Sequence, residues 1–474
     1  MTKTTRELLK SLAFYALPLG IFLCIISPFL LSEGMFMDGL IYSTVSKNLS
    51  NGIGDFWNPH FTNYVAPVFR GHPPLGFGIQ SIWFRIFGDN FIIDKLFSLS
   101  TFCITAFILL KIWKQLGLKH AWILLFFWVL VPIVQWSTTN NVLENTMTIF
   151  TSLSVLFYLK SLENKRFVYL TLTGIMLALA LLTKGPVALF PWSFPIILWF
   201  CIRRQTIRYS IIDTSYIVLS TLLPIVLLMF FSNAAKESLF GYFNEQVLNS
   251  LKNIATVDSR FWILQKLLKQ ITLPLILLLI IYFRGSRMKF DFALSYPKRR
   301  MQLAFILLAL SGILPIMVSM KQSGFYVLGT FPFFAIAFSL IVYPYVDAFI
   351  KRFDFSSKTF IVFQVLSFGI FLSGIGLALT FKNTIPREEA KINDCHLILS
   401  QLNTGDNINI LPSMSQDWSL CGFFARFKNV NLDPTLENSH EYLLVDNQFY
   451  NDSILKRYKL VPLKTKQFTL YHRL

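Results

Sequence analysis

Charged residues are scarce in this sequence, and acidic residues are the scarcest. Only 14% of the 474 residues are Asp, Glu, Lys or Arg, whereas 54% are hydrophobic, and the mean hydropathy is +0.55. A soluble protein of this length needs a much larger polar surface. The composition therefore excludes a water-soluble enzyme and indicates a polytopic membrane protein.

Cysteine is also scarce, with five residues in the whole chain, and this excludes a scaffold built on disulfides. Cys24, Cys103 and Cys201 lie in apolar stretches, where we expect them to pack against neighbours. Cys395 and Cys421 lie in the more polar last part of the chain, where an oxidising compartment would allow them to pair. The sequence leaves open whether they form a disulfide or stay as two buried thiols.

Long apolar runs are abundant. A helix needs about 20 apolar residues to cross the hydrocarbon core of a bilayer, where its backbone must satisfy its own hydrogen bonds. We therefore predict an all-α membrane domain of about 11 transmembrane helices. The lipid bilayer that surrounds these helices is one of the expected partners. These spans cover residues 11–32, 91–113, 120–137, 144–161, 167–183, 186–202, 210–232, 267–283, 302–319, 324–345 and 359–381.

Lysine and arginine gather in alternate loops between these spans, and this bias predicts the orientation. By the positive-inside rule the basic loops are cytoplasmic. Much of the net charge of +18 comes from this bias, and no basic stripe of the kind that binds nucleic acid is visible, so no nucleic-acid partner is predicted. The residues that set the orientation are Lys3, Arg6, Lys10, Lys114, Lys119, Lys165, Arg166, Arg203, Arg204, Arg208, Arg284, Arg287, Lys289, Lys298, Arg299, Arg300, Lys351, Arg352 and Lys358.

The extracytoplasmic segments predict the domain organisation. Residues 1–382 form the membrane domain, with a first outer loop over 33–90 and a second over 233–266, where Tyr242, Glu245 and Arg260 are expected to shape an acceptor entrance. Residues 383–474 are predicted to form a small extracytoplasmic α/β domain. Within it, INDCHLILSQLN has helical spacing, NINILP and EYLLVDN are typical of strands, and YKLVPLKTKQFTLYHRL of a closing hairpin.

The first outer loop carries a candidate base. Asp38 follows the first span and precedes an amphipathic stretch in which Ile41, Val45 and Leu49 share a face, which is typical of a helix in the membrane interface. Partial desolvation there would raise the basicity of the carboxylate, as a general base for an acceptor hydroxyl requires. The alternative is an ordinary helix cap, because Asp is common at helix starts.

Two further pairs of polar residues are candidates for the site. Arg70 and His72 precede two prolines that stiffen the returning chain, so both could meet a phosphate, although a histidine beside prolines also serves as a structural hydrogen-bonding residue. Glu144 and Asn145 open the fourth span. A carboxylate at that depth suggests a site or a paired partner, or else it simply caps the helix.

Two lysines lie on the side opposite the basic loops. Lys184, in LLTKGPVALF, and Lys321, in VSMKQSGFYVLGTFPFF, stand beside Gly and Pro breaks, and Tyr326 follows the second. Since orientation does not explain these cations, we interpret them as anion-binding residues, and phosphate is the anion that fixed cations in a poorly solvated groove would attract. The alternative is that each lysine snorkels to the lipid headgroups.

In chain order these pieces resemble a known family. Asp38 near the end of the first span, the PPL loop with IFGDN, the TKGP turn and the segment KQSGFYVLGTFPFFAIA are similar to the GT-C-fold glycosyltransferases, specifically bacterial protein O-mannosyltransferase-like and aminoarabinose-transferase-like enzymes. The resemblance covers about the first 345 residues. It implies a GT-C-type membrane domain, a polyprenyl-phosphate sugar as the donor, Asp38 as the base, and a bacterial cytoplasmic (inner) membrane as the location.

The chain departs from the family pattern at two places. Relatives usually carry Glu-Lys-Pro-Pro-Leu in the return loop, where this chain has Gly71 and His72 before its prolines. They also often carry Asp-Glu in the first motif, where this chain has Asp38 and Gly39. Glu144 or Asn145 falls where relatives have an aspartate. No cofactor is firmly implied, and the sequence leaves open whether a divalent metal takes part.

The resulting hypothesis is an inverting glycosyltransferase on the extracytoplasmic face. Asp38 takes the proton of an envelope acceptor, which is a protein, a glycolipid or a glycan. Lys184 and Lys321, with Arg70 and His72, neutralise the departing phosphate. Two alternatives stay open: a transporter or flippase of a lipid-linked anion, against which the absence of a clear internal repeat counts, and a catalytically silent scaffold of an envelope complex.

Overall fold

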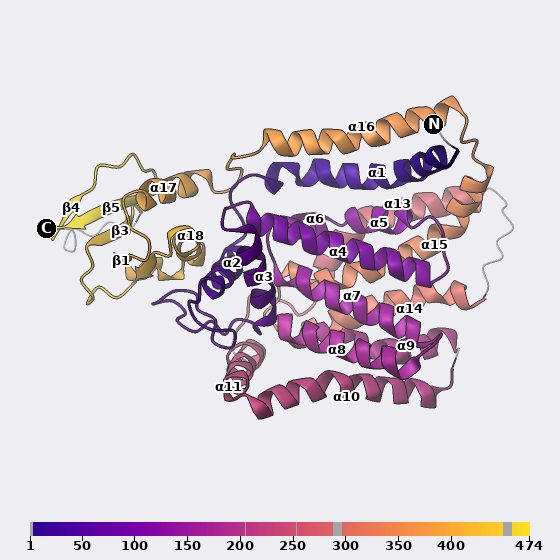
Figure 1. The fold of residues 1–474 in the computed structure, drawn as a ribbon, viewed down its shortest axis with the longest axis horizontal. Helices are drawn as coiled ribbons and strands as arrows, with labels where there is room; N and C mark the ends of the chain where they lie inside the picture. The colour runs from indigo at the N-terminus through magenta and orange to yellow at the C-terminus, as the bar shows by residue number, and fades with distance from the viewer. Residues whose placement is uncertain (1–2, 204, 253, 288–295, 449–456) are drawn as a thin grey trace. The chain divides into compact units, whose positions relative to one another are not determined.

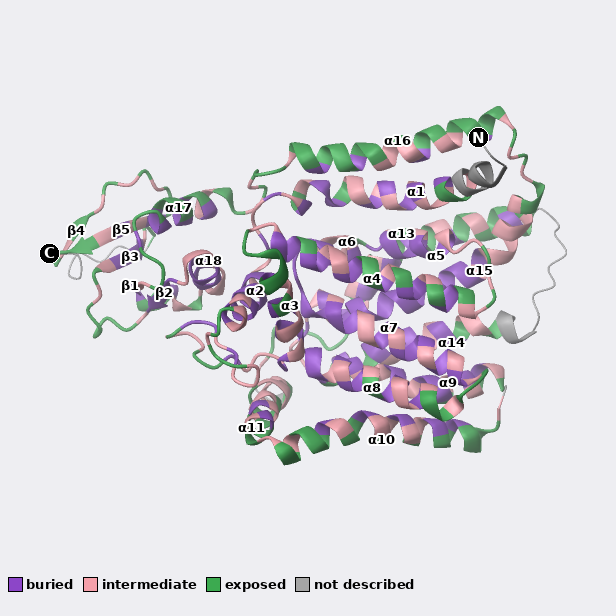
Figure 2. Cartoon of the chain, in the orientation of Figure 1, coloured by how far each residue is buried: buried purple, intermediate pink, exposed green. Residues whose placement is uncertain are grey.

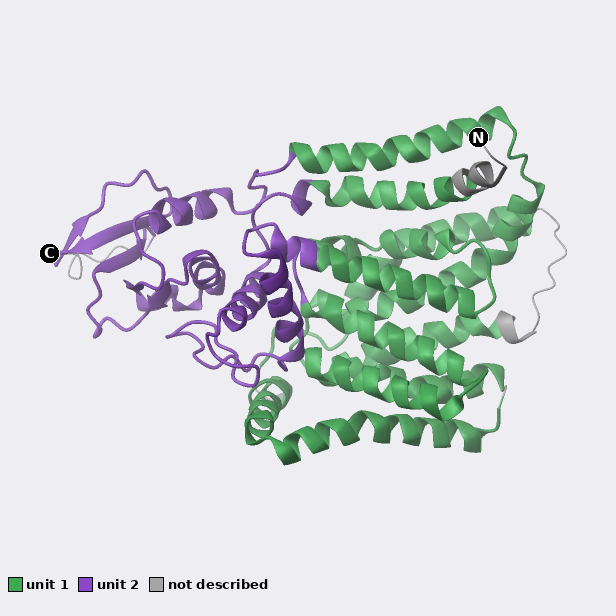
Figure 3. Cartoon of the chain, in the orientation of Figure 1, with its two compact units in different colours: residues 1–27, 98–139, 143–380 green, residues 28–97, 140–142, 381–474 purple. Residues whose placement is uncertain are grey.

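The computed structural model describes residues 3–203, 205–252, 254–287, 296–448 and 457–474, so Arg204 and Lys289 of the orienting residues lie outside it. The chain divides into two compact units, coloured separately in Figure 3. Unit 1 comprises residues 1–27, 98–139 and 143–380, and unit 2 comprises residues 28–97, 140–142 and 381–474.

Among the described residues of unit 1, the regular elements are all helices, and these run side by side (Figure 1). Helices α1 and α4 each begin in one unit and end in the other. Its elements are α1 (Lys3–Leu30), α4 (Ile93–Gln115), α5 (Trp122–Val129), α6 (Pro132–Thr138), α7 (Leu143–Ser161), α8 (Arg166–Lys184), η1 (Pro186–Ser193), α9 (Phe194–Ile202), α10 (Ile207–Phe231), α11 (Asn233–Tyr242), η2 (Phe243–Leu248), α12 (Asn249–Lys252), α13 (Trp262–Ser286), α14 (Tyr296–Ile313), η3 (Leu314–Val318), η4 (Gly324–Thr330), α15 (Phe331–Arg352) and α16 (Lys358–Thr380).

The predicted polytopic helical architecture is confirmed, with fewer full-length spans than the eleven apolar runs. Among the described residues, eight helices are long and apolar enough to cross a membrane, and the bent pair α6 and α7 makes a ninth if it counts as one span. Prolines break two of the predicted runs, because proline interrupts the helical hydrogen-bond ladder. Pro132 separates α5 from α6, and Pro186 and Pro191 hold the first part of the 186–202 run in a 3₁₀ helix.

The outer helices of unit 1 expose apolar side chains. Phe230 and Phe231 of α10 are 78% and 79% exposed, and Val365 of α16 is 67% exposed. Figure 2 shows exposed residues along the length of both helices. Water-facing helices rarely present such continuous apolar surface, whereas helices surrounded by lipid do.

Unit 2 combines the first outer loop with the end of the chain. The loop contributes α2 (Met37–Ser50) and α3 (Leu75–Phe87). The C-terminal part contributes α17 (Glu389–Leu399), η5 (Pro412–Gln416), α18 (Trp418–Lys428) and the strands β1 (Asn407–Ile410), β2 (Asn431–Asp433), β3 (Tyr442–Asp446), β4 (Tyr458–Leu460) and β5 (Phe468–Arg473). The amphipathic helix predicted after Asp38 is therefore present as α2, and it packs against α3 and α18.

The five strands form one mixed sheet in the order β2-β1-β3-β5-β4. Strand β1 pairs in parallel with β2 and β3, with Ile408 opposite Leu432 and Ile410 opposite Leu444. Strands β4 and β5 pair in antiparallel fashion, and β4 forms one edge of the sheet. The predicted helix, strands and hairpin of the α/β segment are confirmed, whereas β2 and α18 were not predicted.

The structure answers whether Cys395 and Cys421 form a disulfide, which the sequence left open. All five are free thiols, and Cys395 and Cys421 are both buried in unit 2. Burial raises the pKa of the Cys395 thiol and raises that of Cys421 to about 12. Because the thiolate is the reactive form, both residues are expected to be inert packing residues.

Candidate active site

Asp38 lies in the first turn of α2, which begins at Met37 after an extended Phe36. Negative charge is favourable there, because the first backbone N–H groups of a helix lack partners within it. One turn further on, the Tyr42 hydroxyl lies 3.5 Å from Asp38 Oδ2 and 2.9 Å from His72 Nε2. Within unit 2, Tyr42 thus stands between the candidate base and the candidate phosphate-binding histidine.

The start of α2 is fixed by two adjacent asparagines that the sequence reasoning passed over. Asn140 Oδ1 accepts a hydrogen bond from the Phe36 backbone N–H at 2.8 Å, and Asn141 Nδ2 donates to the Gly39 carbonyl at 3.2 Å. A Cβ on Gly39 would lie 2.2 Å from the Asn140 carbonyl oxygen. This contact leaves no room for a side chain at the position after Asp38.

The return loop places Arg70 and His72 just before α3. Both side chains are partly buried, whereas Pro73 and Pro74 are buried, and Pro74 caps α3. Proline fixes its own φ and restricts the residue before it, so the backbone of His72 is held in a defined direction ahead of α3. The edge-to-face contact of its ring with Tyr42, at 5.4 Å between centroids, fixes that direction further.

Unit 1 brings Glu144 and Lys184 together as a buried ion pair. Lys184 Nζ lies 3.0 Å from Glu144 Oε1, and the two side chains are 4% and 1% exposed. Glu144 stands in the first turn of α7 and Lys184 in the last turn of α8, so each charge has the sign that its helix end favours. The Lys184 ammonium is therefore buried inside the protein.

The TKGP turn around Lys184 is held by aromatic residues. Gly185 has φ +94°, a region that favours glycine, and a Cβ there would lie 2.0 Å from the Tyr242 hydroxyl oxygen. That hydroxyl donates to the Lys184 carbonyl at 3.2 Å. The Lys184 ammonium also lies 5.8 Å from the ring centroids of Phe325 and Tyr326, within cation–π range. Tyr242 of the second outer loop therefore supports this turn.

Lys321 and Asn145 have different surroundings. Lys321 precedes η4 and donates from Nζ to Gln246 Oε1 at 3.2 Å. Asn145 Nδ2 donates to Ser98 Oγ and to the Ser137 carbonyl, both at 2.9 Å. Of the two residues that open α7, Glu144 thus faces the lysine, and Asn145 ties α7 to α4 and α6. Within the described ranges, no group of three or more His, Cys, Asp and Glu side chains is arranged to hold a metal ion.

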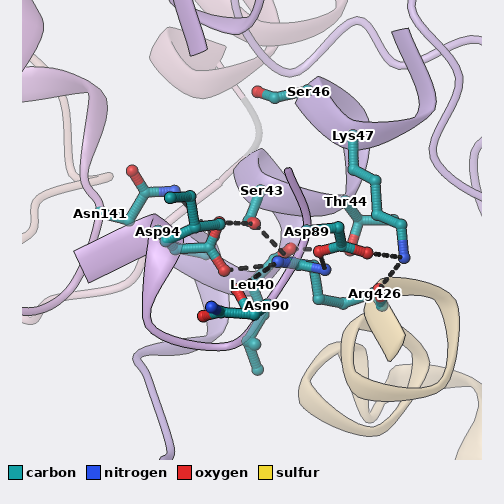
Figure 4. A network of polar contacts seen from close by, with 12 residues as sticks. Leu40, Ser43, Thr44, Ser46, Lys47, Asp89, Asn90, Asp94, Asn141 and Arg426 are labelled. Carbon is teal, nitrogen blue, oxygen red and sulfur yellow. Dashed lines mark hydrogen bonds and ion pairs between the residues drawn. The ribbon is translucent and has the colours of Figure 1, made fainter. Parts of the chain in front are cut away.

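Unit 2 also holds a buried polar network that the sequence did not reveal (Figure 4). Arg426 of α18 is 1% exposed. Its Nη1 lies 2.6 Å from Asp89 Oδ1, and its Nε lies 3.1 Å from Asp94 Oδ2 and 2.8 Å from Ser43 Oγ. Lys47 of α2 lies 2.7 Å from Asp89 Oδ2 and donates to the Arg426 carbonyl at 2.7 Å. The C-terminal segment is thereby bonded to α2, the helix that carries Asp38.

Comparison with known proteins adds one match of part of the sequence. Residues 71–232 match the family model described as dolichyl-phosphate-mannose-protein mannosyltransferase. This segment contains His72, Glu144 and Lys184, and it includes neither Asp38 nor Lys321. No curated protein matches the chain by sequence.

The fold is similar to that of solved membrane proteins. ArnT from Cupriavidus metallidurans in the apo state superposes with a TM-score of 0.65 at 12% identity, over 96% of each chain. The same protein bound to undecaprenyl phosphate gives a TM-score of 0.68 at 12% identity, over 100% of this chain and 99% of that one. The chain has the GT-C fold. The apo oligosaccharyltransferase of Archaeoglobus fulgidus is also similar, with a TM-score of 0.54 at 11% identity, over 94% of this chain and 70% of that one.

The GT-C fold confirms the fold class and the resemblance that the sequence motifs indicated. The similarity to ArnT extends through unit 2, because it spans the whole chain, whereas the motifs reached only about residue 345. The catalytic and phosphate-binding roles of Asp38, His72, Lys184 and Lys321 stay predictions.

Proposed function

We propose that this GT-C-fold chain is a membrane glycosyltransferase that moves a sugar from a polyprenyl phosphate to an envelope acceptor with inversion at the anomeric carbon. The observation that carries the proposal is the whole-chain similarity to ArnT, which in one structure is bound to undecaprenyl phosphate. The partial match to the mannosyltransferase family model supports the same reaction class.

Asp38 is the proposed base. Its carboxylate accepts the proton of the acceptor hydroxyl while the acceptor oxygen bonds to the anomeric carbon, and the bond from that carbon to the phosphate oxygen breaks. The lipid phosphate leaves with the bonding electron pair, so the charge on Asp38 is replaced by a charge on the phosphate. The Tyr42 hydroxyl, which lies between Asp38 and His72, keeps the carboxylate oriented.

Cationic side chains are proposed to stabilise the leaving phosphate. Lys184 is already paired with Glu144, so a phosphate would compete with this carboxylate for the ammonium. Lys321, Arg70 and His72 are the other proposed phosphate ligands. Preorganised donors of this kind contribute roughly 3–4 kcal/mol each where they have been removed singly.

The reaction is proposed to occur on the extracytoplasmic face of a bacterial cytoplasmic membrane, with the C-terminus on the same side. The bias of Lys and Arg toward alternate loops supports this orientation. A phosphatase fused after Leu474 should then be active in intact cells, because such reporters work only outside the cytoplasm. A fusion at the 163–165 turn, between α7 and α8, should be inactive.

Transfer of radiolabelled sugar from polyprenyl phosphates tests the function. Wild type in lipid vesicles should label an envelope extract, and Asp38→Asn should lower the rate by about 10² to 10⁴, the usual contribution of a general base. Glu437→Gln is the matched control, because Glu437 is an exposed carboxylate of the same unit, and its rate should equal that of wild type.

Two results would count against the proposal. Full transfer by a correctly folded Asp38→Asn variant would show that another group is the base. No transfer by wild type from a series of donors, together with movement of the donor lipid between leaflets, would establish a flippase instead.

A further inference from the structure

A cavity of about 220 Å³ lies in unit 1, at the end of α7 opposite to Glu144. Tyr158 and Leu159 line it, and at 1.5 Å per residue they stand about 20 Å along α7 from Glu144. The cavity is therefore separate from the Lys184–Glu144 pair. Its apolar wall comes from α7, α9, α14 and α15 and from the turn after α4, and it includes Leu116, Leu159, Leu198, Trp199, Met301 and Leu340.

Two of the polar residues that line this cavity, Tyr158 and Gln205, are bonded to each other. Gln205 Nε2 donates to the Tyr158 hydroxyl and to Asp213 Oδ2, both at 3.3 Å, and Arg166 binds Asp213 at 2.7 Å. Apart from Gln115 and Glu163, the rest of the lining is apolar, and apolar cavities do not hold water well. Since a water molecule occupies about 30 Å³, the volume corresponds to about seven groups of that size, which is enough for a segment of a hydrocarbon chain.

Basic residues flank the cavity lining in the sequence, and we call these residues the basic rim. The exposed residues Lys114, Lys119 and Arg203 each directly adjoin a lining residue in the sequence. One carboxylate, Glu163, belongs to the lining as well. Basic pockets between membrane helices on the cytoplasmic side are suited to anionic lipid headgroups, and this end of unit 1 is the one that the charge bias predicts to be cytoplasmic.

We propose that this cavity binds one acyl chain of an anionic phospholipid, whose phosphate is held by the basic rim. The charge complementarity of Lys114, Lys119 and Arg203 selects an anionic lipid over a zwitterionic one, and the apolar wall accepts its chain. This lipid is distinct from the sugar donor, because the cavity lies about 20 Å along α7 from Glu144.

Trp199 allows the proposal to be tested by fluorescence, because brominated acyl chains quench a tryptophan that they touch. Wild type and Trp199→Phe would be placed in phosphatidylcholine nanodiscs with increasing fractions of brominated phosphatidylglycerol or brominated phosphatidylcholine. The difference between the two proteins isolates Trp199. Quenching of Trp199 should saturate at a lower fraction of the brominated phosphatidylglycerol than of the brominated phosphatidylcholine.

Neutralising the rim should remove this preference. A basic residue near an anionic lipid contributes about 1 kcal/mol, or about fivefold in affinity, so Lys119→Gln with Arg203→Gln should lower the preference by more than tenfold. Lys236→Gln, an exposed lysine on α11, should leave it unchanged. Equal quenching by the two lipids, absence of quenching, or a preference that survives the double substitution would each overturn the proposal, whatever the outcome of the sugar-transfer assay.

Discussion

The two units bury positive charge in different ways. In unit 1, Lys184 and Glu144 form an ion pair at two helix ends, with the faces of Phe325 and Tyr326 nearby. In unit 2, Arg426 binds two carboxylates, a hydroxyl and a backbone carbonyl that come from three other parts of that unit. One arrangement is a pair, whereas the other is a branched network.

This difference decides how the Arg426 guanidinium and the Lys184 ammonium can respond to a ligand. A guanidinium has a rigid fork of donors, and Nε, Nη1 and Nη2 of Arg426 all have acceptors, so a ligand could bind only by breaking several bonds at once. An ammonium is a compact point charge that can exchange one anion for another. We therefore interpret the Arg426 network as structural and the Lys184 pair as the part that a phosphate can enter.

The largest expected effect is the loss of stability in Arg426→Met. This substitution leaves Asp94 buried without its cation, and removing one member of a buried pair typically costs about 3–5 kcal/mol. The melting temperature of the purified protein should fall by on the order of 10 °C. Arg473→Met, at an exposed arginine of β5, serves as the control and should melt as wild type does.

A triple variant separates the effect of the stranded charges on stability from the effect of lost packing in this network. Adding Asp89→Asn and Asp94→Asn to Arg426→Met removes the stranded charges, so most of the stability should return, and sugar transfer should return with it. Restored melting without restored transfer would contradict the structural interpretation of Arg426.

For the Lys184 pair, removing both charges should restore stability without restoring sugar transfer. Lys184→Met leaves Glu144 uncompensated at 1% exposure, so stability should fall by about 3 kcal/mol. Transfer should fall by about 10² or more because a phosphate ligand is lost. Combining Lys184→Met with Glu144→Leu removes both charges and should recover the stability. Transfer should stay low, and it is measured at matched folded protein. A double variant that transfers at the wild-type rate would make this pair structural as well.

The local features of the fold were accessible from the sequence. The helix after Asp38, the TKGP break and the strands of the C-terminal segment follow from patterns within about 15 residues, where spacing and turn residues decide the structure. Their burial did not follow. The sequence predicted a shared apolar face of Ile41 and Val45 but not what covers it: both are buried inside unit 2, where α2 packs against α3 and α18.

Partners that are distant in sequence could not be predicted. Arg426 meets Ser43 across 383 residues, and nothing near Arg426 in the sequence marks it as different from the other basic residues. Lys184 and Glu144 were both candidates, but their pairing depends on how α7 and α8 pack side by side. The NN dipeptide at 140–141 carried a usable signal, because Asn141 adopts a left-handed φ of 49° that asparagine tolerates better than most residues.

The smallest predicted effect is the acid sensitivity of Asp89. Burial opposes its ionisation, but the charge of Arg426 and the hydrogen bonds from Lys47 and Arg426 outweigh burial and hold the pKa of the carboxyl below its usual range. A carboxyl whose folded pKa is depressed stabilises the protein above its unfolded pKa, near 4, and loses that contribution as the pH falls through the folded value. The Asp89 side chain is 40% exposed, so solvent screens it and the contribution is at most about 1 kcal/mol.

The melting temperature, measured from pH 6 down to pH 3, should therefore fall less steeply in Asp89→Asn than in wild type. An equal slope would mean that Asp89 titrates normally and that Asp94 alone compensates Arg426.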